Sequence, residues 1–405
     1  MNTSQMLKLT DLNTNQLFRL YAQSEKLMHI ATEFKSTLDL ALARSQIVDV
    51  FKFYDLGEVK EVYQIFGGYV NTSFGVYAEK DGKKYEYFVR KYKKGIQEKE
   101  MELEHSLIDF SIANGLDIAA GLIRSRDGKT FIKLPEEFNG KVEYRYFAVY
   151  DFLHGEDKYT WIDPYLTDEE FISFAGVLAT FHNASRHYDP KGRERVEPKI
   201  LEFIKILPQI FIDFSKTDIN NKFHSFYLNN LDDILASIAR VQIPEEDAAK
   251  MPYNPVHCDY HPGNVKFQDG KVVGIFDFDW AKIDHRLFDV CFSIVYSCCA
   301  WEDLPDGSVD GDIRLDKVKV YLKGYQDKLK ELGGLEPLNE TEKKYFPMMI
   351  EATNNYLINW CLSTYYSDTE NYNVYEYLAY LTHQVKMMKW INEHKDELAE
   401  VAASV

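Results

Sequence analysis

Cysteine is scarce in this sequence: there are five in 405 residues, and none form a CxxC pair or the spacing of a zinc site. The odd number leaves at least one thiol unpaired, which favours a reducing cytoplasmic environment over a disulfide scaffold. Long apolar runs are also lacking, because the longest, from Leu287 to Trp301, is interrupted by Asp289 and serines. Residues 1–30 lack the basic start and apolar core of a secretory signal. We therefore expect a cytoplasmic protein with no membrane span.

Positive charge is outnumbered, since 47 Lys and Arg face 64 Asp and Glu, for a net charge of −17. Nucleic-acid binders rely on clustered Lys and Arg to release counterions, so this balance argues against a nucleic-acid partner. An acidic surface suits a neutral or cationic small molecule better. With 45% hydrophobic and 27% charged residues, the composition is that of a folded globular chain. The length allows roughly two domains.

The N-terminal part, residues 1–55, has the periodicity of helices. One apolar face and then a second one are formed by Leu17, Phe18, Leu20, Tyr21 and Leu27, and by Ile47, Val48, Phe51 and Tyr54. This pattern predicts a helical extension before the first domain.

Residues 56–150 change character to short runs rich in Val, Ile, Tyr and Phe, separated by the turn dipeptides Asp81-Gly82 and Asp127-Gly128. Strands are predicted over 59–66, 73–79, 84–92, 121–126, 129–134 and 143–150, with one helix over 97–114. Helical periodicity returns in residues 151–405, starting with a capping box of Thr167 and Glu170, and a β-like insert is predicted over 256–280. The pattern predicts an α+β fold, a small antiparallel sheet with one helix followed by a larger, mainly helical part.

The most informative segment reads His-Cys-Asp-Tyr-His-Pro-Gly-Asn over 257–264, followed after a hairpin by Asp-Phe-Asp over 277–279. Phosphoryl transfer requires a carboxylate that orients the acceptor hydroxyl, oxygen ligands for Mg²⁺, and cations near the phosphates. Asp259 and Asn264 lie on one tight loop and can face a shared space, and Asp277 ends an apolar strand. Such hard oxygen ligands suit Mg²⁺, which takes only one or two carboxylates from a protein.

This motif, H-x-D-x-H-P-G-N and then D-F-D, resembles that of the aminoglycoside phosphotransferase and choline kinase family, which are relatives of protein kinases that act on small molecules. The resemblance spans about 40–365. It implies a two-lobed protein-kinase-like fold, with an ATP-binding N-lobe at 56–150 and a C-lobe at 151–405 that carries the catalytic loop and the substrate-binding helices. It also implies transfer of the γ-phosphate of ATP to a small-molecule hydroxyl.

Within the motif, the resemblance implies that Asp259 is the catalytic base and that Asn264 and Asp277 bind Mg²⁺, assisted by Asp279. Cys258 stands where the family usually has Gly, which puts the tightness of the loop in doubt. His257 resembles the structural histidine of the kinase catalytic loop. Two further residues resemble structural supports of that loop, namely His182 behind it and Asp289 as a brace.

The ATP-binding residues implied by the resemblance lie mostly before residue 155. The turn at 67–73 matches a loop over the phosphates, which assigns Asn71, Thr72 and Ser73 to the nucleotide. In the third strand only one of Arg90 and Lys91 can face inward; the register favours Arg90 and leaves Lys91 as a surface charge. Among four glutamates of the following helix, Glu104 is expected to pair with Arg90, and the others to be solvated. Backbone groups at Asp151 and Leu153 are expected to bind adenine at the hinge.

Three other readings compete with this one. His257, Asp259 and His261 at alternate positions could ligate zinc in a metal-dependent hydrolase, but Pro262-Gly263 and Asp-Phe-Asp would then have no role. A catalytically inactive nucleotide-binding module would be expected to lack the base or a Mg²⁺ ligand, and all are present. A protein kinase would need a peptide-binding A-P-E segment, which is missing.

The acceptor is the least determined feature. The segments 321–325 and 337–342 look like those of the homoserine-kinase-like and sugar-kinase-like branches. Acidic residues at 303, 306, 310 and 312 could recognise an amine, although a solvated loop is the simpler explanation. Asn354, Asn355, Asn359 and Trp360 could bind a sugar. On this basis a sugar or amino sugar ranks slightly above an amino alcohol, homoserine or an aminoglycoside.

Overall fold

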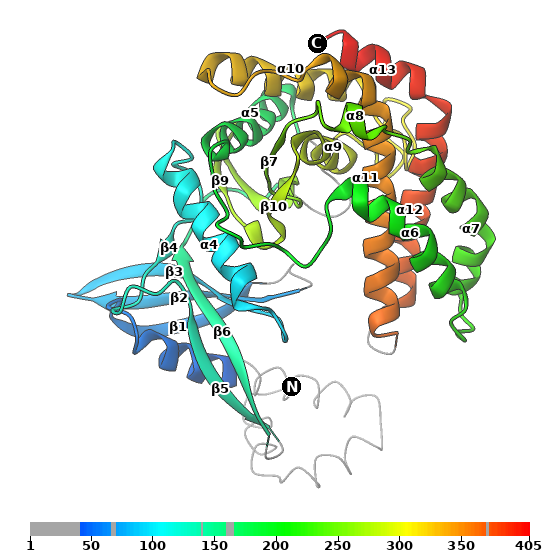
Figure 1. The fold of residues 1–405 in the computed structure, drawn as a ribbon. Coiled ribbons are helices and arrows are strands. Elements are labelled where there is room, and N and C mark those ends of the chain that lie inside the picture. The colour runs from blue at the N-terminus through cyan, green and yellow to red at the C-terminus, as the bar shows by residue number, and fades with distance from the viewer. Residues whose placement is uncertain (1–40, 66–69, 139–140, 159–165, 370–371) are drawn as a thin grey trace. The chain divides into compact units, whose positions relative to one another are not determined.

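A computed structural model describes residues 41–65, 70–138, 141–158, 166–369 and 372–405 (Figure 1). The expected apolar face at Leu17 to Leu27 lies outside the described residues. By its contacts the chain separates into two compact units. Unit 1 comprises Met1–Gly95 and Leu122–Phe152, and unit 2 comprises Ile96–Gly121 and Leu153–Val405.

Unit 1 is built on an antiparallel sheet of six strands, in the order β1-β2-β3-β6-β4, with β5 also paired to β6. The strands are β1 (Glu58–Ile65), β2 (Thr72–Lys80), β3 (Lys83–Lys91), β4 (Leu122–Ile123), β5 (Ile132–Phe138) and β6 (Lys141–Asp151). The tight turn at Asp81-Gly82 joins β2 to β3, with Lys80 opposite Lys83, as expected from that dipeptide.

One expected hairpin is wrong. A turn does form at Asp127-Gly128, where the Ser125 N–H donates to the Lys129 carbonyl over 2.9 Å. Its arms do not pair with each other, because β4 is only two residues long and both β4 and β5 bind to β6. A turn dipeptide reports local backbone geometry, whereas the choice of partner depends on a strand far along the chain.

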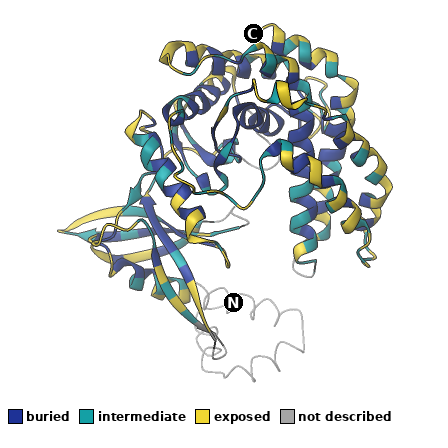
Figure 2. Ribbon diagram, viewed as in Figure 1, coloured by how far each residue is buried: buried dark blue, intermediate teal, exposed yellow. Residues whose placement is uncertain are grey.

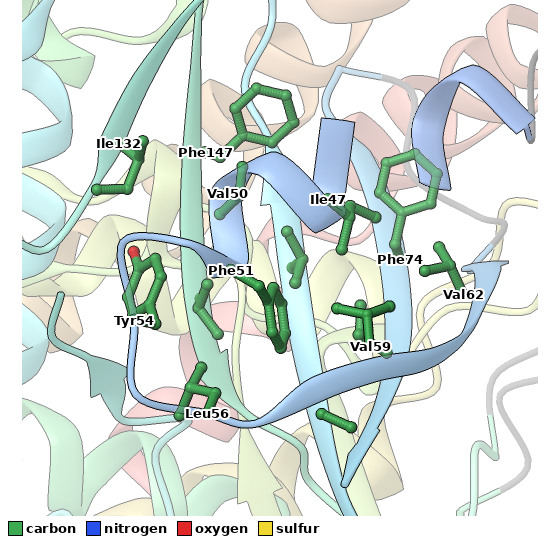
Figure 3. Packing of buried hydrophobic residues seen from close by; sticks show 14 residues of the cluster. Ile47, Val50, Phe51, Tyr54, Leu56, Val59, Val62, Phe74, Ile132 and Phe147 are labelled. Atoms are coloured by element: carbon green, nitrogen blue, oxygen red, sulfur yellow. The ribbon is translucent and has the colours of Figure 1, made fainter. Parts of the chain in front are cut away.

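The helix over 41–51 packs on one face of this sheet and completes its core. Ile47, Val50 and Phe51 join buried side chains of the strands in a single apolar cluster (Figure 3). Because β-strand side chains alternate between faces, Val89 on β3 points into this core and its neighbour Arg90 points to the opposite face. The helical extension expected before the sheet is therefore, in its described part, a component of unit 1.

Unit 2 is mainly helical. Its helices are α4 (Glu98–Ala113), α5 (Asp168–Ser185), α6 (Ile200–Ser215), α7 (Lys222–Arg240), α8 (Glu245–Ala248), α9 (Arg286–Ser297), α10 (Leu315–Leu332), α11 (Glu340–Ser367), α12 (Val374–Glu393) and α13 (Lys395–Ala403). The capping box at the start of α5 is present, with the Thr167 N–H donating to Glu170 Oε2 over 2.8 Å. The helix expected over 97–114 is α4, and its contacts group it with unit 2.

Two small ladders lie within unit 2, β7 (Tyr253–Val256) with β10 (Lys282–His285), and β8 (Val265–Gln268) with β9 (Lys271–Ile275). They are the β-like insert expected over 256–280. Helix α9 follows β10 directly, and all 12 of its residues are buried (Figure 2). The apolar stretch that begins at Leu287 is thus a core helix, and no helix among the described residues is long and apolar enough to cross a membrane.

We predict that Phe51→Ala lowers the free energy of unfolding by about 3–5 kcal/mol, because it opens a cavity in the core of unit 1. The matched control is Phe53→Ala, since Phe53 is 45% exposed and its removal should cost less than about 0.5 kcal/mol. Denaturant unfolding monitored by circular dichroism measures both. Equal losses in the two variants would contradict the packing described for this helix.

Candidate active site

The loop at 257–264 and the Asp-Phe-Asp turn are brought together by β-ladder pairing. Strand β7 leads into the loop, the β8–β9 hairpin carries the chain to Asp277, and β10 then returns antiparallel to β7, with Lys282 opposite Val256 (Figure 1). The start and end of the segment are therefore neighbours. This topology puts Asp259 and Asp277 close together although eighteen positions separate them.

The carboxylate of Asp289 on α9 holds the start of the loop. It accepts the backbone N–H of His257 at Oδ2 (2.7 Å) and that of Cys258 at Oδ1 (2.9 Å). His182 of α5 contacts Oδ2 through Nε2 at 2.9 Å and reaches the Tyr325 hydroxyl through Nδ1 at 2.7 Å. Asp289 and His182 are fully buried. Both residues act as the structural supports that the sequence suggested.

Cys258 adopts a left-handed backbone conformation, with φ = 62°. Glycine reaches this region without steric cost, whereas other L-residues lose roughly 1–2 kcal/mol there. The hydrogen bond from the Cys258 N–H to Asp289 helps to hold this conformation. Replacement of the family's usual Gly by Cys therefore leaves the tight turn of the loop in place. The Cys258 side chain is buried, as are those of the other four cysteines, and all five are free thiols.

Asp259 and Asn264 form a direct pair. The Asn264 amide nitrogen donates to Asp259 Oδ2 over 2.9 Å and to the Asp259 carbonyl over 2.8 Å. Because the amide nitrogen serves Asp259, the amide oxygen of Asn264 is the atom that can meet a cation. The Asp259 side chain is 27% exposed, so it is reachable by a ligand.

Three carboxylates determine the electrostatics of this site. Burial raises the pKa of the Asp259 carboxyl, and the charges of Asp277 and Asp279 raise it further, against the lowering effect of the Asn264 hydrogen bond. The net result is a pKa well above its ordinary value. A cation among these carboxylates would offset the repulsion and favour the ionised form of Asp259. The donor set of Asn264, Asp277 and Asp279 thus fits a hard divalent cation.

Neither loop histidine is arranged as a metal ligand. His257 is fully buried and its Nε2 donates to the Phe276 carbonyl over 3.0 Å, so this side chain does not touch substrate. His261 accepts the Gly263 N–H at Nδ1 over 3.0 Å, and burial lowers its pKa to about 3. Within the described residues, no group of three or more His, Cys, Asp or Glu side chains could hold a metal ion. The hydrolase reading finds no support here.

Arg90 and Lys91 of β3 lie on opposite faces of the sheet in unit 1. Arg90 is 3% exposed, and its guanidinium lies 5.5–5.9 Å from the ring centres of Phe88, Tyr92 and Tyr150. Lys91 is on the face covered by the helix over 41–51, where it forms an ion pair with Glu136 and donates to Gln46 over 3.0 Å. Lys91 is therefore not the solvated surface charge that was expected, and Arg90 is buried on the opposite face of the sheet.

The phosphate loop is described only from Val70 onward. Thr72 and Ser73 begin β2, and Ser73 lies opposite Arg90 in the β2–β3 ladder. The Asn71 side chain accepts the Lys93 N–H over 2.9 Å. Unit 1 thus gathers Asn71, Thr72, Ser73 and Arg90 at one end of the β2–β3 pair.

The remaining nucleotide-binding candidates flank the boundary between the units. Asp151 ends β6 in unit 1, and Leu153 is the first residue of the second segment of unit 2, where it packs near Gly274. Glu104 on α4 is 3% exposed and Glu100 is also buried, so the expectation that at least three of the four glutamates are solvated is wrong. Pairing of Glu104 with Arg90 would join the two units and stays a prediction.

Two of the four residues considered for a sugar are not available to one, whereas Asn359 and Trp360 are half-buried. Asn354 and Asn355 are fully buried on α11, where their amides donate to the Gln384 carbonyl (3.1 Å) and to the Ser237 hydroxyl (3.0 Å). The ring of Trp360 lies near those of Tyr377 and Tyr380 on α12. Helical spacing alone cannot tell an inward face that packs on other helices from one that lines a pocket.

The acidic segment at 303–312 uses its carboxylates internally. Asp306 and Asp312 accept backbone N–H groups of Ser308 and Val309 at 2.9 and 3.0 Å. Asp310 binds His383 of α12 over 2.6 Å. The possibility that these residues recognise an amine gains no support, because their carboxylates stabilise their own loop. The segment at 337–342 is likewise structural, because Asn339 caps α11 and Glu342 binds the buried Arg286.

Sequence reasoning gave no role to Arg195, which contacts the Asp-Phe-Asp turn. Its guanidinium donates to the Asp279 carbonyl, lies 4.9 Å from the ring centre of Trp280, and approaches Glu100 of α4 at 3.8 Å. The charged run at 193–197 was the sequence feature that could have pointed to Arg195, but such a run is equally typical of a solvated linker.

Comparison with known proteins shows sequence similarity to phosphotransferases. The model of the phosphotransferase enzyme family (APH) matches residues 63–313. Homoserine kinase of Ralstonia nicotianae is 25% identical over 309 residues, which cover 74% of this chain and 79% of that protein.

Solved structures share the fold at lower identity. A microcompartment-associated aminopropanol kinase aligns with a TM-score of 0.60 and 13% identity, covering 88% of this chain and 98% of that one. Spectinomycin phosphotransferase in complex with ADP and spectinomycin aligns at 0.58 and 16%, covering 86% and 98%. Amicoumacin kinase in complex with AMP-PNP, Ca²⁺ and amicoumacin aligns at 0.58 and 16%, covering 88% and 95%. The expected fold class, with an antiparallel sheet and a mainly helical C-terminal part, is confirmed.

We predict that Asp289→Asn destabilises the protein by about 1–3 kcal/mol for each buried N–H left without an acceptor, and reduces kinase activity as the loop loosens. Asp306→Asn, in the exposed loop, is the control and should change the free energy of unfolding by less than about 0.5 kcal/mol. Thermal unfolding and ATP turnover measure the two effects. Wild-type stability and turnover in Asp289→Asn would show that the loop does not depend on this carboxylate.

Proposed function

The chain belongs to the phosphotransferase enzyme family and is a kinase of small molecules with a hydroxyl acceptor, and we propose that it transfers the γ-phosphate of ATP to an amino alcohol or hydroxy amino acid such as homoserine. The observation that carries this proposal is the Asp259–Asn264 pair in a loop braced by Asp289. It combines a reachable carboxylate with an amide oxygen for a cation.

In the proposed reaction, Asp259 accepts or orients the proton of the acceptor hydroxyl as its oxygen attacks the γ-phosphorus and the bond to the β-phosphate oxygen breaks. ADP is the leaving group. The hydrogen bond from Asn264 to Oδ2 fixes the Asp259 carboxylate, and Oδ1, which lies 3.6 Å from His261 Nε2, would face the acceptor hydroxyl. Such positioning is most of what an enzyme contributes to phosphoryl transfer.

Asn264 and Asp277 would hold Mg²⁺, with Asp279 assisting, and the ion neutralises phosphate charge when bound. The support from this chain is the repulsion among Asp259, Asp277 and Asp279, which raises the pKa of Asp259 and is relieved by a cation. On unit 1, Arg90 would bind the phosphates with the backbone and side chains of Asn71, Thr72 and Ser73. Asp151 and Leu153 would offer backbone groups to adenine.

The acceptor class rests on the comparisons. Homoserine and aminopropanol, named for the relative and for the structural neighbour, each carry a hydroxyl and an amine. The earlier preference for a sugar rested partly on Asn354 and Asn355, which are fully buried. We therefore rank homoserine and short amino alcohols first. The reading as an inactive nucleotide-binding module has no observation in its favour, since Asp259, Asn264 and Asp277 are all present.

We predict that Asp259→Asn lowers kcat by on the order of 10²–10⁴, because the amide cannot accept the hydroxyl proton. ATP consumption in the presence of Mg²⁺ is measured with homoserine, 3-aminopropanol, ethanolamine, choline, N-acetylglucosamine and an aminoglycoside. Removal of one of three like charges should leave the folded state at least as stable as wild type. Near-full turnover in the variant would exclude Asp259 as the base.

We further predict that Asp277→Asn raises the Mg²⁺ concentration needed for half-maximal turnover by about 10-fold or more, because a carboxylate ligand is lost. Asn is chosen because Asp277 has φ = 67°, and Asn tolerates the left-handed conformation as well as Asp does. Asp269→Asn is the matched control, since Asp269 also has positive φ (50°) at a turn between β8 and β9. An unchanged Mg²⁺ requirement with a lowered melting temperature would make Asp277 a structural residue.

A further inference from the structure

A buried ion-pair cluster lies beside the catalytic loop. Lys282 of β10 is 4% exposed, and its ammonium contacts Glu197 Oε1 at 2.9 Å, the Pro198 carbonyl at 2.7 Å and Asp284 Oδ2 at 3.3 Å. Lys282 lies opposite Val256 in the β7–β10 ladder, and Val256 directly precedes the loop that begins at His257. The cluster is therefore fixed to the strand that presents Asp259.

Tyr356 of α11 also contacts this cluster. Its hydroxyl donates to Glu197, at 3.2 Å from Oε1 and 3.1 Å from Oε2. Its ring packs against Phe288 of α9 and Phe203 of α6, with ring centres 5.4 and 5.7 Å away. Burial raises the pKa of Tyr356, and the charge of Glu197 raises it further.

The three charged groups differ in what they can still offer a ligand. Lys282 donates to Glu197 Oε1 and to the Pro198 carbonyl and forms an ion pair with Asp284, and its side chain is 4% exposed, so its ammonium is shielded from a ligand. Asp284 is fully buried and accepts the N–H groups of Ile200 and His285 at 2.7 and 2.8 Å. Glu197 is 18% exposed and accepts only from Lys282 and Tyr356, while a carboxylate has about four lone-pair sites. Glu197 is thus the member of the cluster with both access and spare acceptor capacity.

The exposed part of this cluster is the Glu197 carboxylate, which accepts hydrogen bonds, because the Lys282 ammonium is buried. The Tyr356 hydroxyl uses its proton on Glu197 and can itself only accept further bonds. The net charge of the cluster also favours a positively charged ligand group, because two carboxylates share one ammonium. A ligand group that only donates and carries positive charge, namely a primary ammonium, complements it, whereas a carboxylate or phosphate would meet repulsion.

We propose that Glu197 and the Tyr356 hydroxyl bind the ammonium group of the acceptor and thereby select amino alcohols and hydroxy amino acids over uncharged alcohols. This inference rests on the proposed function, since it names the part of the site that recognises the acceptor. Glu197 and Tyr356 are specificity residues here, and Lys282 positions Glu197 through their ion pair.

The test compares acceptors with and without the amine. Homoserine and 3-aminopropanol carry it, and 4-hydroxybutanoate and 1-propanol are their matched amine-free analogues. Wild type should use the first pair with a much higher kcat/KM than the second. Glu197→Gln should raise KM for the amine-bearing acceptors by roughly 10- to 100-fold, the scale of a charge-assisted hydrogen bond, with KM for ATP unchanged. The preference over the amine-free analogues should fall by the same factor.

Tyr356→Phe provides a gentler variant, because it keeps the ring and the Lys282–Glu197 ion pair. It should raise KM for the amine-bearing acceptors by about 3- to 10-fold, as expected for one neutral hydrogen bond. Glu351→Gln is the control for loss of a buried, cation-paired carboxylate, since Glu351 on the same helix binds Arg240 and Ser237 instead. It should lower the melting temperature without changing KM for any acceptor.

Each outcome separates this inference from the proposed function. If wild type phosphorylates homoserine or 3-aminopropanol but Glu197→Gln and Tyr356→Phe leave its preference for the amine unchanged, the ammonium site is wrong and the proposed function stands. The same holds if KM rises equally for amine-free acceptors. If wild type turns over no amine-bearing acceptor while Asp259-dependent turnover of a sugar is seen, the proposed acceptor class falls and the ammonium site falls with it.

Discussion

The site depends on one carboxylate in a helix that has no exposed residue. Asp289 accepts two successive backbone N–H groups, from His257 and Cys258, and these two bonds turn the chain sharply just before Asp259. Buried N–H groups without acceptors are costly, so the loop and α9 stabilise each other. His182 and Tyr325 continue the network into α5 and α10. A strained residue, Cys258 at positive φ, is tolerated at this point because its N–H has a fixed acceptor.

The same arrangement concentrates negative charge. Ladder pairing of β7 with β10 brings Asp277 and Asp279 back to Asp259, where burial first and then the charges of Asp277 and Asp279 raise the pKa of the Asp259 carboxyl. A protein that bound no cation would gain nothing from such a cluster, because like charges held together reduce stability. We expect a divalent cation and the phosphates that it accompanies to offset this charge, as proposed above. In the neighbouring Lys282–Glu197–Tyr356 cluster the ammonium is buried and Glu197 is the more exposed charge, which is why we propose that Glu197 binds the amine of the phosphate acceptor.

Much of the fold could be predicted from local sequence patterns. The strands β2 and β3, the turn at Asp81-Gly82, helix α4 and the capping box of α5 depend on neighbouring residues, and these expectations agree with the structure. The hairpin expected at 121–134 failed because β4 and β5 both pair with β6, a choice made by residues far along the chain. Asn354 and Asn355 of α11 were considered for sugar binding because sequence spacing does not report which helix face meets another helix.

By itself, the sequence determined the chemistry that is available: a carboxylate, an amide and a second pair of carboxylates in an order that resembles a kinase catalytic loop, and a cation in the third strand. Only the tertiary structure decided which of these groups meet. It placed Arg90 and Lys91 on opposite faces, tied Asp289 to the loop, and brought Glu197, Lys282 and Tyr356 together from three separate elements. The physical reason is that a buried polar group must find its partner in space, and that partner can lie anywhere along the chain.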